Sequence, residues 1–145
     1  MMPVNLSAVR LTITLLIALL FGINDALSES EVNSPPGKII RSQLTTAIVN
    51  REPTDDVVML TNNSEKIYYF TELSDLNGHK ITHRWEHNGQ VMAEINFKVK
   101  SDRWRVFSSK IIKPDWTGNW SVSLIDENGS SLKVSNFEVV DSKTN

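Results

Sequence analysis

Short runs of alternating apolar and polar residues dominate this sequence, and they constrain its fold more than any other feature. Alternation of this kind is typical of β-strands with one buried face, because successive side chains on a strand point to opposite sides. Between residues 41 and 140, no segment shows helical spacing over ten or more residues. We therefore predict about seven strands, at 42–49, 65–73, 79–86, 91–98, 103–109, 118–126 and 131–139.

Two Asn-Gly pairs set the register of the predicted hairpins. A three-residue loop at 87–89 places Trp85 opposite Val91 and gathers the apolar side chains of both strands on one face. A two-residue loop would turn Trp85 away from those side chains. The same reasoning at the second turn, 127–129, places Trp120 on the inner face.

These hairpins and the three further strands favour an all-β fold, an antiparallel, immunoglobulin-like sandwich of two sheets. A small barrel is the alternative architecture. The chain has no cysteine, so it lacks the Cys-Trp-Cys signature of true immunoglobulin domains and cannot form disulfides. A domain of about 100 residues can bury enough surface to be stable without them.

The N-terminal segment has the pattern of a signal peptide. Arg10 precedes an uninterrupted apolar run, Leu11–Ile23, which is shorter than the roughly 20 residues that span a bilayer. The small residues Ala26 and Ser28 predict cleavage between Ser28 and Glu29. An uncleaved N-terminal anchor is the alternative. We expect an exported protein, periplasmic or secreted, with no stable membrane anchor after cleavage.

The domain organisation follows from these patterns. We predict a signal peptide at 1–28, a flexible linker with a Pro-Pro-Gly sequence at 29–40, the β-sandwich at 41–140 and a polar tail at 141–145. The formal net charge of −2 argues against nucleic acid as a partner. We expect a monomer, or a weak homodimer through a sheet edge.

Motifs of catalysis and cofactor binding are missing from the sequence. It has no thiol, no Gly-x-Ser-x-Gly elbow and no glycine-rich phosphate loop. His79, His83 and His87 are four residues apart, about 13 Å along a strand, which is too far for one metal ion. We predict no enzyme activity, no cofactor and no metal. A less favoured hypothesis is an enzyme that uses His83 with Glu86 or Glu94.

Two clusters of arginine and aromatic residues are candidate binding sites. Arg84 and Glu94 are expected to be diagonal neighbours on a polar sheet face, and Arg103 and Arg105 flank Trp104. Guanidinium groups bind carboxylates through paired hydrogen bonds, so these residues could recognise an anionic group on a cell-envelope partner. The alternative is structural: the arginines stack on exposed faces or form salt bridges with neighbouring glutamates.

Trp116 differs from the other tryptophans because it lies in the predicted loop Lys-Pro-Asp-Trp-Thr-Gly. Loop aromatics are common binding anchors, so Trp116 could hold a cell-wall glycan. A ring that folds back over the end of the sandwich is an equal alternative. The candidate partner is therefore a protein or a glycan of the cell envelope.

Several long strings in this sequence carry a family resemblance. They are LTTAIVNREPTDDV, IYYFTEL, ITHRWEHNGQVMAEINFKV, RWRVFSSK and PDWTGNWSVSLIDENGSSL. Together, from Arg41 to Phe137, they resemble the bacterial family called domain of unknown function 2914. The resemblance implies a small extracytoplasmic β-sandwich without an assigned activity, and it supplies no catalytic residues.

Overall fold

The computed structural model describes residues 37–64 and 66–143 of the chain. The predicted signal peptide, its cleavage site and most of the predicted linker lie outside the described residues. Within them the chain forms ten strands and no helix. The all-β prediction is confirmed.

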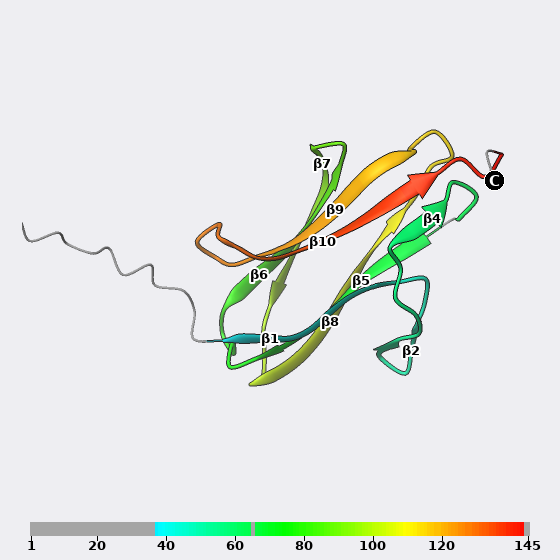
Figure 1. The fold of residues 1–145 in the computed structure, drawn as a ribbon. Helices are drawn as coiled ribbons and strands as arrows, with labels where there is room; N and C mark the ends of the chain where they lie inside the picture. The colour runs from blue at the N-terminus through cyan, green and yellow to red at the C-terminus, as the bar shows by residue number, and fades with distance from the viewer. Residues whose placement is uncertain (1–36, 65, 144–145) are drawn as a thin grey trace, which may run out of the picture. The chain divides into compact units, whose positions relative to one another are not determined.

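Two sheets and one small hairpin make up the structure (Figure 1). The three-stranded sheet has the order β1 (Lys38–Thr45), β5 (Lys66–Ser74) and β8 (Arg103–Ile111). The five-stranded sheet has the order β4 (Met59–Thr61), β10 (Ser131–Val140), β9 (Gly118–Ile125), β6 (Lys80–His87) and β7 (Gln90–Lys98). The hairpin pairs β2 (Ile48–Val49) with β3 (Glu52–Pro53).

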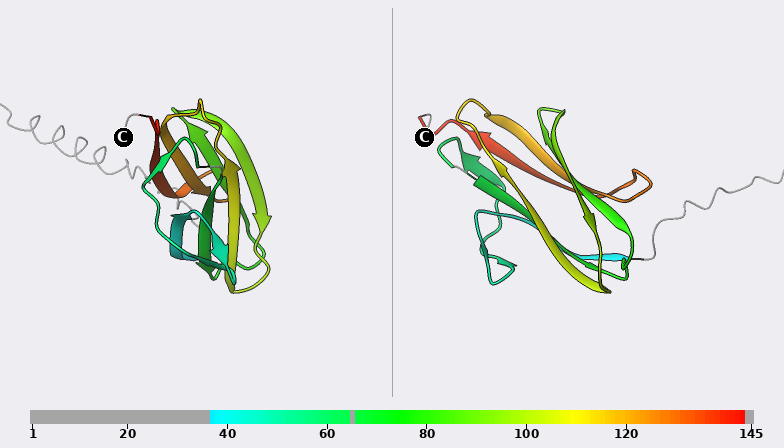
Figure 2. Two further views of the ribbon diagram at one scale, coloured as in Figure 1. Left: turned by 90° about the vertical axis from the view of Figure 1, so that its right-hand side faces the viewer. Right: turned by 180° about the vertical axis from the view of Figure 1, so that it is seen from behind.

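The two sheets pack face to face as the layers of a sandwich (Figure 2). All strand pairs are antiparallel except β4 with β10, which are parallel. The chain changes sheets between β1 and β4, through the β2–β3 hairpin, and then between β4 and β5, β5 and β6, β7 and β8, and β8 and β9. Crossings of this kind give the immunoglobulin-like architecture that the sequence predicts.

Alternation along the strands fills the core, as expected from the pattern of apolar residues. Tyr69 of β5, Trp85 of β6 and Trp120 of β9 are almost completely buried between the sheets. Burial of side chains of this size stabilises the fold by roughly 2 kcal/mol each. The remaining members of the same core are Leu44, Val57, Leu60, Ile67, Leu73, Leu76, Ile81, Val99, Val106, Ile112, Val122, Leu124, Phe137 and Val139.

The first Asn-Gly turn corrects the predicted register. Residues 88–89 form a two-residue loop in which both φ angles are positive, 47° and 80°. Such a turn matches the twist of the strands. A bulge then leaves one extra residue of β7 without a partner on β6, and this places Trp85 opposite Ala93. The apolar side chains still share one face, except for Val91, which is 49% exposed.

The second hairpin also carries a register shift, between Ser131 and Lys133. Beyond it, Phe137 lies opposite Trp120, and their rings stack with centroids 5.8 Å apart. The prediction that Trp120 faces the core is confirmed.

The beginning of the domain differs from the prediction in two ways. The first strand begins at Lys38, so residues 38–40 belong to β1 rather than to the linker. It ends at Thr45 instead of continuing to position 49, because the chain turns there into the β2–β3 hairpin. That hairpin and the short β4 were not predicted from the sequence.

Gly118 lies where two loops pack closely together at one end of the sandwich. Its φ is +109°, and a Cβ atom there would lie 2.8 Å from Oδ1 of Asn88. That oxygen accepts a hydrogen bond from the backbone N–H of Asn119. We expect Gly118→Ala to lower the free energy of unfolding by about 1–3 kcal/mol, measured by urea denaturation. Gly129→Ala is the matched control, since it has a φ of +85° with open space around it; a larger loss for Gly129→Ala would contradict the expectation.

Candidate functional site

A buried carboxylate, Glu72, organises the outer face of the three-stranded sheet. Ile67, Tyr69 and Leu73 of β5 face the core, so Glu72 points to the opposite side of the sheet. The Glu72 side chain is nevertheless only 1% exposed. A charged group at such a position requires partners of opposite charge.

Three arginines surround the Glu72 carboxylate. Oε1 accepts hydrogen bonds from Nε of Arg103 at 2.6 Å and from Nε of Arg105 at 3.2 Å. Oε2 accepts a hydrogen bond from Nε of Arg41 at 2.8 Å. Burial alone would raise the pKa of Glu72, but the hydrogen bonds from these arginines outweigh it and lower the pKa to about 2. Glu72 therefore stays ionised and fixes the plane of each guanidinium group.

A second carboxylate, Glu52 of β3, lies over the same arginines. Its Oε2 is 2.8 Å from Nη2 of Arg41, and its Oε1 is 2.7 Å from Nη1 of Arg105. Because Arg41 lies on β1 and Arg105 on β8, the hairpin crosses the outer face of the sheet. We call Arg41, Arg51, Glu52, Glu72, Arg103 and Arg105 the arginine cluster.

The β2–β3 hairpin is held at its base and strained at its tip. Asp55 accepts hydrogen bonds at its base from the hydroxyl of Thr45 and from the backbone N–H of Thr46, the latter at 2.7 Å. At the tip, Asn50 and Arg51 have φ values of 50° and 64°, which are uncommon for residues other than glycine. From this turn, Nη2 of Arg51 donates a hydrogen bond to the backbone carbonyl of Arg105 at 3.4 Å.

Phe70 forms an apolar floor beside the arginine cluster. It is fully buried but does not belong to the core between the sheets. The guanidinium carbon of Arg41 lies 5.0 Å from the centre of its ring, within the range of a cation–π interaction. The cluster is therefore built over a buried aromatic ring.

The arginine cluster keeps unused hydrogen-bond donors. Arg103 has a side-chain exposure of 66%, and its Nε is occupied by Glu72. Within residues 37–64 and 66–143, Nη1 and Nη2 of Arg103 have no hydrogen-bonding partner. An orientated guanidinium with two unused nitrogens presents the fork that a carboxylate binds bidentately.

A hollow of about 350 Å³ opens beside this fork. The indole N–H of Trp104 is buried and has no hydrogen-bond acceptor in the described part of the chain. The hollow combines guanidinium donors with the side chain of Trp104. Its lining residues are Arg51, Ser101, Arg103, Trp104 and Arg105.

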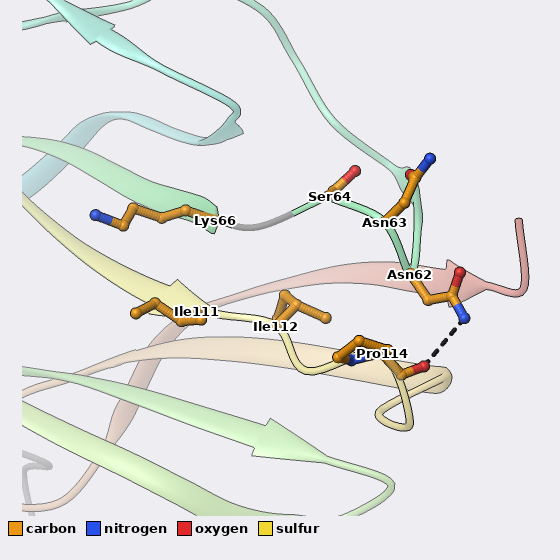
Figure 3. Close-up of a pocket in the computed structure, with 7 residues that line it drawn as sticks. All are labelled: Asn62, Asn63, Ser64, Lys66, Ile111, Ile112 and Pro114. Carbon is orange, nitrogen blue, oxygen red and sulfur yellow. Dashed lines mark hydrogen bonds between the residues drawn. The ribbon is translucent and has the colours of Figure 1, made fainter.

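A second hollow, of about 490 Å³, lies at the other end of β8 (Figure 3). Its apolar side comes from Ile111, Ile112 and Pro114, and Ile111 is 64% exposed. Asn62 on the rim donates a hydrogen bond to the carbonyl of Pro114 at 3.0 Å. Asn63, Ser64 and Lys66 complete the lining.

The structure separates the predicted arginine residues. Arg103 and Arg105 belong to the arginine cluster, whereas Arg84 and Glu94 lie on the outer face of the five-stranded sheet. Arg84 and Glu94 are directly opposite each other rather than diagonal, and Nε of Arg84 is 2.6 Å from Oε1 of Glu94. The two-residue loop and the bulge in β7 together cause this change of register. Arg84 and Glu94 thus form a salt bridge with each other, as the alternative of a structural role for the arginines predicts.

Trp116 is half-buried against the end of the core, as the lid alternative predicts. Its carbonyl accepts a hydrogen bond from the Trp120 indole at 3.1 Å. The ammonium groups of Lys110 and Lys113 lie 5.4 Å and 4.8 Å from the centre of the Trp116 ring. Part of the ring surface is therefore already used, and the glycan hypothesis has less support than the arginine cluster.

His83 is enclosed by the core, so the hypothesis of a solvent-accessible catalytic His83 is wrong. Its ring nitrogens contact the hydroxyl groups of Thr71 at 3.1 Å and Ser108 at 2.9 Å, not Glu86 or Glu94. Burial lowers the pKa of His83 to about 3. The imidazole is neutral and serves as a polar element of the core.

Sequence reasoning missed Arg41, Arg51, Glu52 and Glu72 as members of the site. The available signal was Glu72, the one charged residue in the run YYFTEL, which lies within a strand. In the described residues, no helix could cross a bilayer. In that same part, no group of three or more histidine or acidic side chains is arranged to hold a metal ion.

Comparison with known proteins adds a family but no activity. A family model described as "Protein of unknown function (DUF2914)" matches residues 78–139. The predicted family is confirmed over that segment, while residues 41–77, which carry part of the arginine cluster, lie outside the match. No curated protein matches the chain.

Among the solved structures with a distant similarity is the crystal structure of a Se-Met labelled β-glucosidase from Kluyveromyces marxianus. The identity is 12% and the TM-score 0.39. The match covers 68% of this chain but only 14% of the β-glucosidase chain. A likeness at this level carries no argument about function.

Proposed function

We propose that this chain, which belongs to the DUF2914 family of proteins of unknown function over residues 78–139, is a non-enzymatic binding module of the bacterial periplasm. Its site is the arginine cluster, and its ligand is a carboxylate or similar anionic group on a cell-envelope partner. The predicted signal peptide supports the location. The observation that carries the binding role is the orientated guanidinium of Arg103, with two unused nitrogens beside a hollow.

The chemistry of the cluster supports recognition rather than catalysis. Four arginines and two glutamates give it a formal charge of +2, although the whole chain carries −2. Both carboxylates already accept hydrogen bonds from arginine, and burial and pairing keep Glu72 ionised. The cluster can therefore donate hydrogen bonds to an anion but offers no free base for proton transfer.

Arg103→Lys tests the proposed role because it keeps the charge and removes the fork. We expect the variant to bind the diacidic probe acetyl-Glu-Glu-amide at least tenfold more weakly than the unaltered protein, measured by calorimetric titration. Loss of one bidentate carboxylate contact, about 1.5–3 kcal/mol, corresponds to that change.

Arg84→Lys is the matched control, since Arg84 pairs with a single exposed glutamate on the other sheet. It should leave the affinity unchanged. Equal affinities for acetyl-Glu-Glu-amide in the unaltered protein and in Arg103→Lys would contradict the proposal. So would equal binding of acetyl-Gln-Gln-amide.

A further inference from the structure

The strand that carries Arg103 and Arg105 is also an exposed edge of its sheet. The nine residues of β8 pair with β5 from Arg103 to Ile111 without a register shift. In the part of the chain that the structure describes, no strand pairs with the other side of β8. Such an edge presents unpaired backbone N–H and C=O groups to a further strand.

The other sheet edges are short or irregular, whereas β8 is long and regularly paired. β4 has only three residues. The pairing of β7 with β6 contains a bulge, and β1 has a register shift between Ile39 and Arg41. Short, bulged edges are the usual means by which proteins prevent strand addition. The regular edge of β8 is therefore the one best suited to accept another strand.

Both hollows of the three-stranded sheet adjoin this same strand. Arg103, Trp104 and Arg105 line the first at its beginning. Ile111, at its end, lines the second (Figure 3). Eight residue steps of a strand span about 26 Å, so a segment of about nine residues would reach from one hollow to the other.

The side chains of β8 indicate what such a segment contains. β8 carries three cations, Arg103, Arg105 and Lys110, and no acidic residue. On its outer face, the residues beyond the arginines are Phe107, which is 42% exposed, Ser109 and Ile111. Charge complementarity requires acidic side chains opposite the beginning of β8, and apolar side chains fit opposite its end.

We infer that the partner is a protein whose extended, acidic peptide segment adds as a strand to the free edge of β8. Backbone hydrogen bonds would supply affinity, while the arginine cluster and the hollow at Ile111 would supply specificity for acidic and apolar side chains. The inference rests on the proposed function, because the arginine cluster is its acidic subsite. A glycan or another anionic polymer is the competing outcome.

Two fluorescein-labelled probe peptides, ETETVTVTV and its reverse VTVTVTETE, cover both strand directions. We expect one of them to bind in fluorescence anisotropy, and to slow hydrogen exchange of backbone amides within Arg103–Ile111. Exchanging both glutamates of that peptide for lysine should weaken binding at least tenfold. The Arg103→Lys protein should show a similar loss.

N-methylation of the binding peptide tests strand addition itself. One version is methylated at odd positions and the other at even positions, so only one of them blocks the edge that faces β8. We expect one version to lose binding at least tenfold more than the other. Equal binding of both versions, protection of β7 instead of β8, binding only of peptidoglycan fragments, or no peptide binding would overturn the inference.

The same experiment separates this inference from the proposed function. If acetyl-Glu-Glu-amide binds in an Arg103-dependent manner but no peptide protects β8, strand addition is wrong and carboxylate recognition stands. If a peptide with glutamine in place of glutamate protects β8 equally well, strand addition stands and carboxylate recognition is wrong.

Discussion

Lowering the pH from 6.5 towards 4 is expected to destabilise this domain by up to about 1.4 kcal/mol per pH unit because of His83 alone. Burial lowers the pKa of His83 from 6.5 to about 3. Between these values the unfolded chain binds a proton at this residue and the folded chain does not. Stability therefore rises with pH across this window and is lost as the pH falls through it.

Urea denaturation at pH 7, 6, 5 and 4 measures this slope, with His83→Gln as the comparison. The variant should be less stable at pH 7, since His83 contacts Thr71 and Ser108 in the core. It should also show a smaller loss of stability between pH 6 and pH 4. If both proteins lose stability in parallel over that range, His83 is not the group responsible.

Glu72→Ala is expected to lower the free energy of unfolding at pH 7 by about 2–4 kcal/mol. The substitution removes the carboxylate to which Arg41, Arg103 and Arg105 all donate hydrogen bonds, and leaves their like charges close together. Glu94→Ala is the matched control. It removes the 45% exposed partner of Arg84, and such surface pairs contribute about 0–1 kcal/mol.

The acidic limb of the pH profile gives a second readout for Glu72. Its pKa in the folded protein is about 2, below the ordinary value of 4.5. A depressed carboxyl pKa stabilises the fold above pH 4.5, and this stabilisation is lost as the pH falls towards 2. Glu72→Gln should therefore lose less stability than the unaltered protein as the pH falls below 4.5, while the slope due to His83 remains. A Glu72→Ala protein within 0.5 kcal/mol of the unaltered one would contradict this role for Glu72.

Alternation of side chains was sufficient to predict the long strands and the core. Trp85 and Trp120 face inward because their strands alternate regularly, and this pattern is local in the sequence. The bulge beside Trp85 was not predictable in the same way. A three-residue loop and a two-residue loop followed by a bulge place the same apolar side chains on one face, apart from Val91, so the pattern alone did not reveal the bulge.

The arginine cluster could be predicted only in part, for a physical reason. Arg103 and Arg105 are conspicuous in the string RWRVF, but their partner Glu72 is 31 residues away from Arg103 and lies on a different strand. Glu52 reaches the site through a hairpin whose turn is formed by Asn50 and Arg51 in the left-handed conformation. The turn contains no glycine, the residue that would have predicted this conformation from the sequence. Strand pairing across the sheet, which sequence alternation does not encode, brings these residues together.

Photo-crosslinking in cells that produce the protein tests the binding role of this face most directly. A photoreactive phenylalanine analogue would replace Phe107 beside the arginine cluster, or Val134, which is 47% exposed on the opposite sheet. The proposed function predicts a crosslinked partner from position 107 that disappears when Arg103 is changed to lysine. Crosslinks from position 134 alone, or crosslinks from position 107 that survive Arg103→Lys, would contradict it.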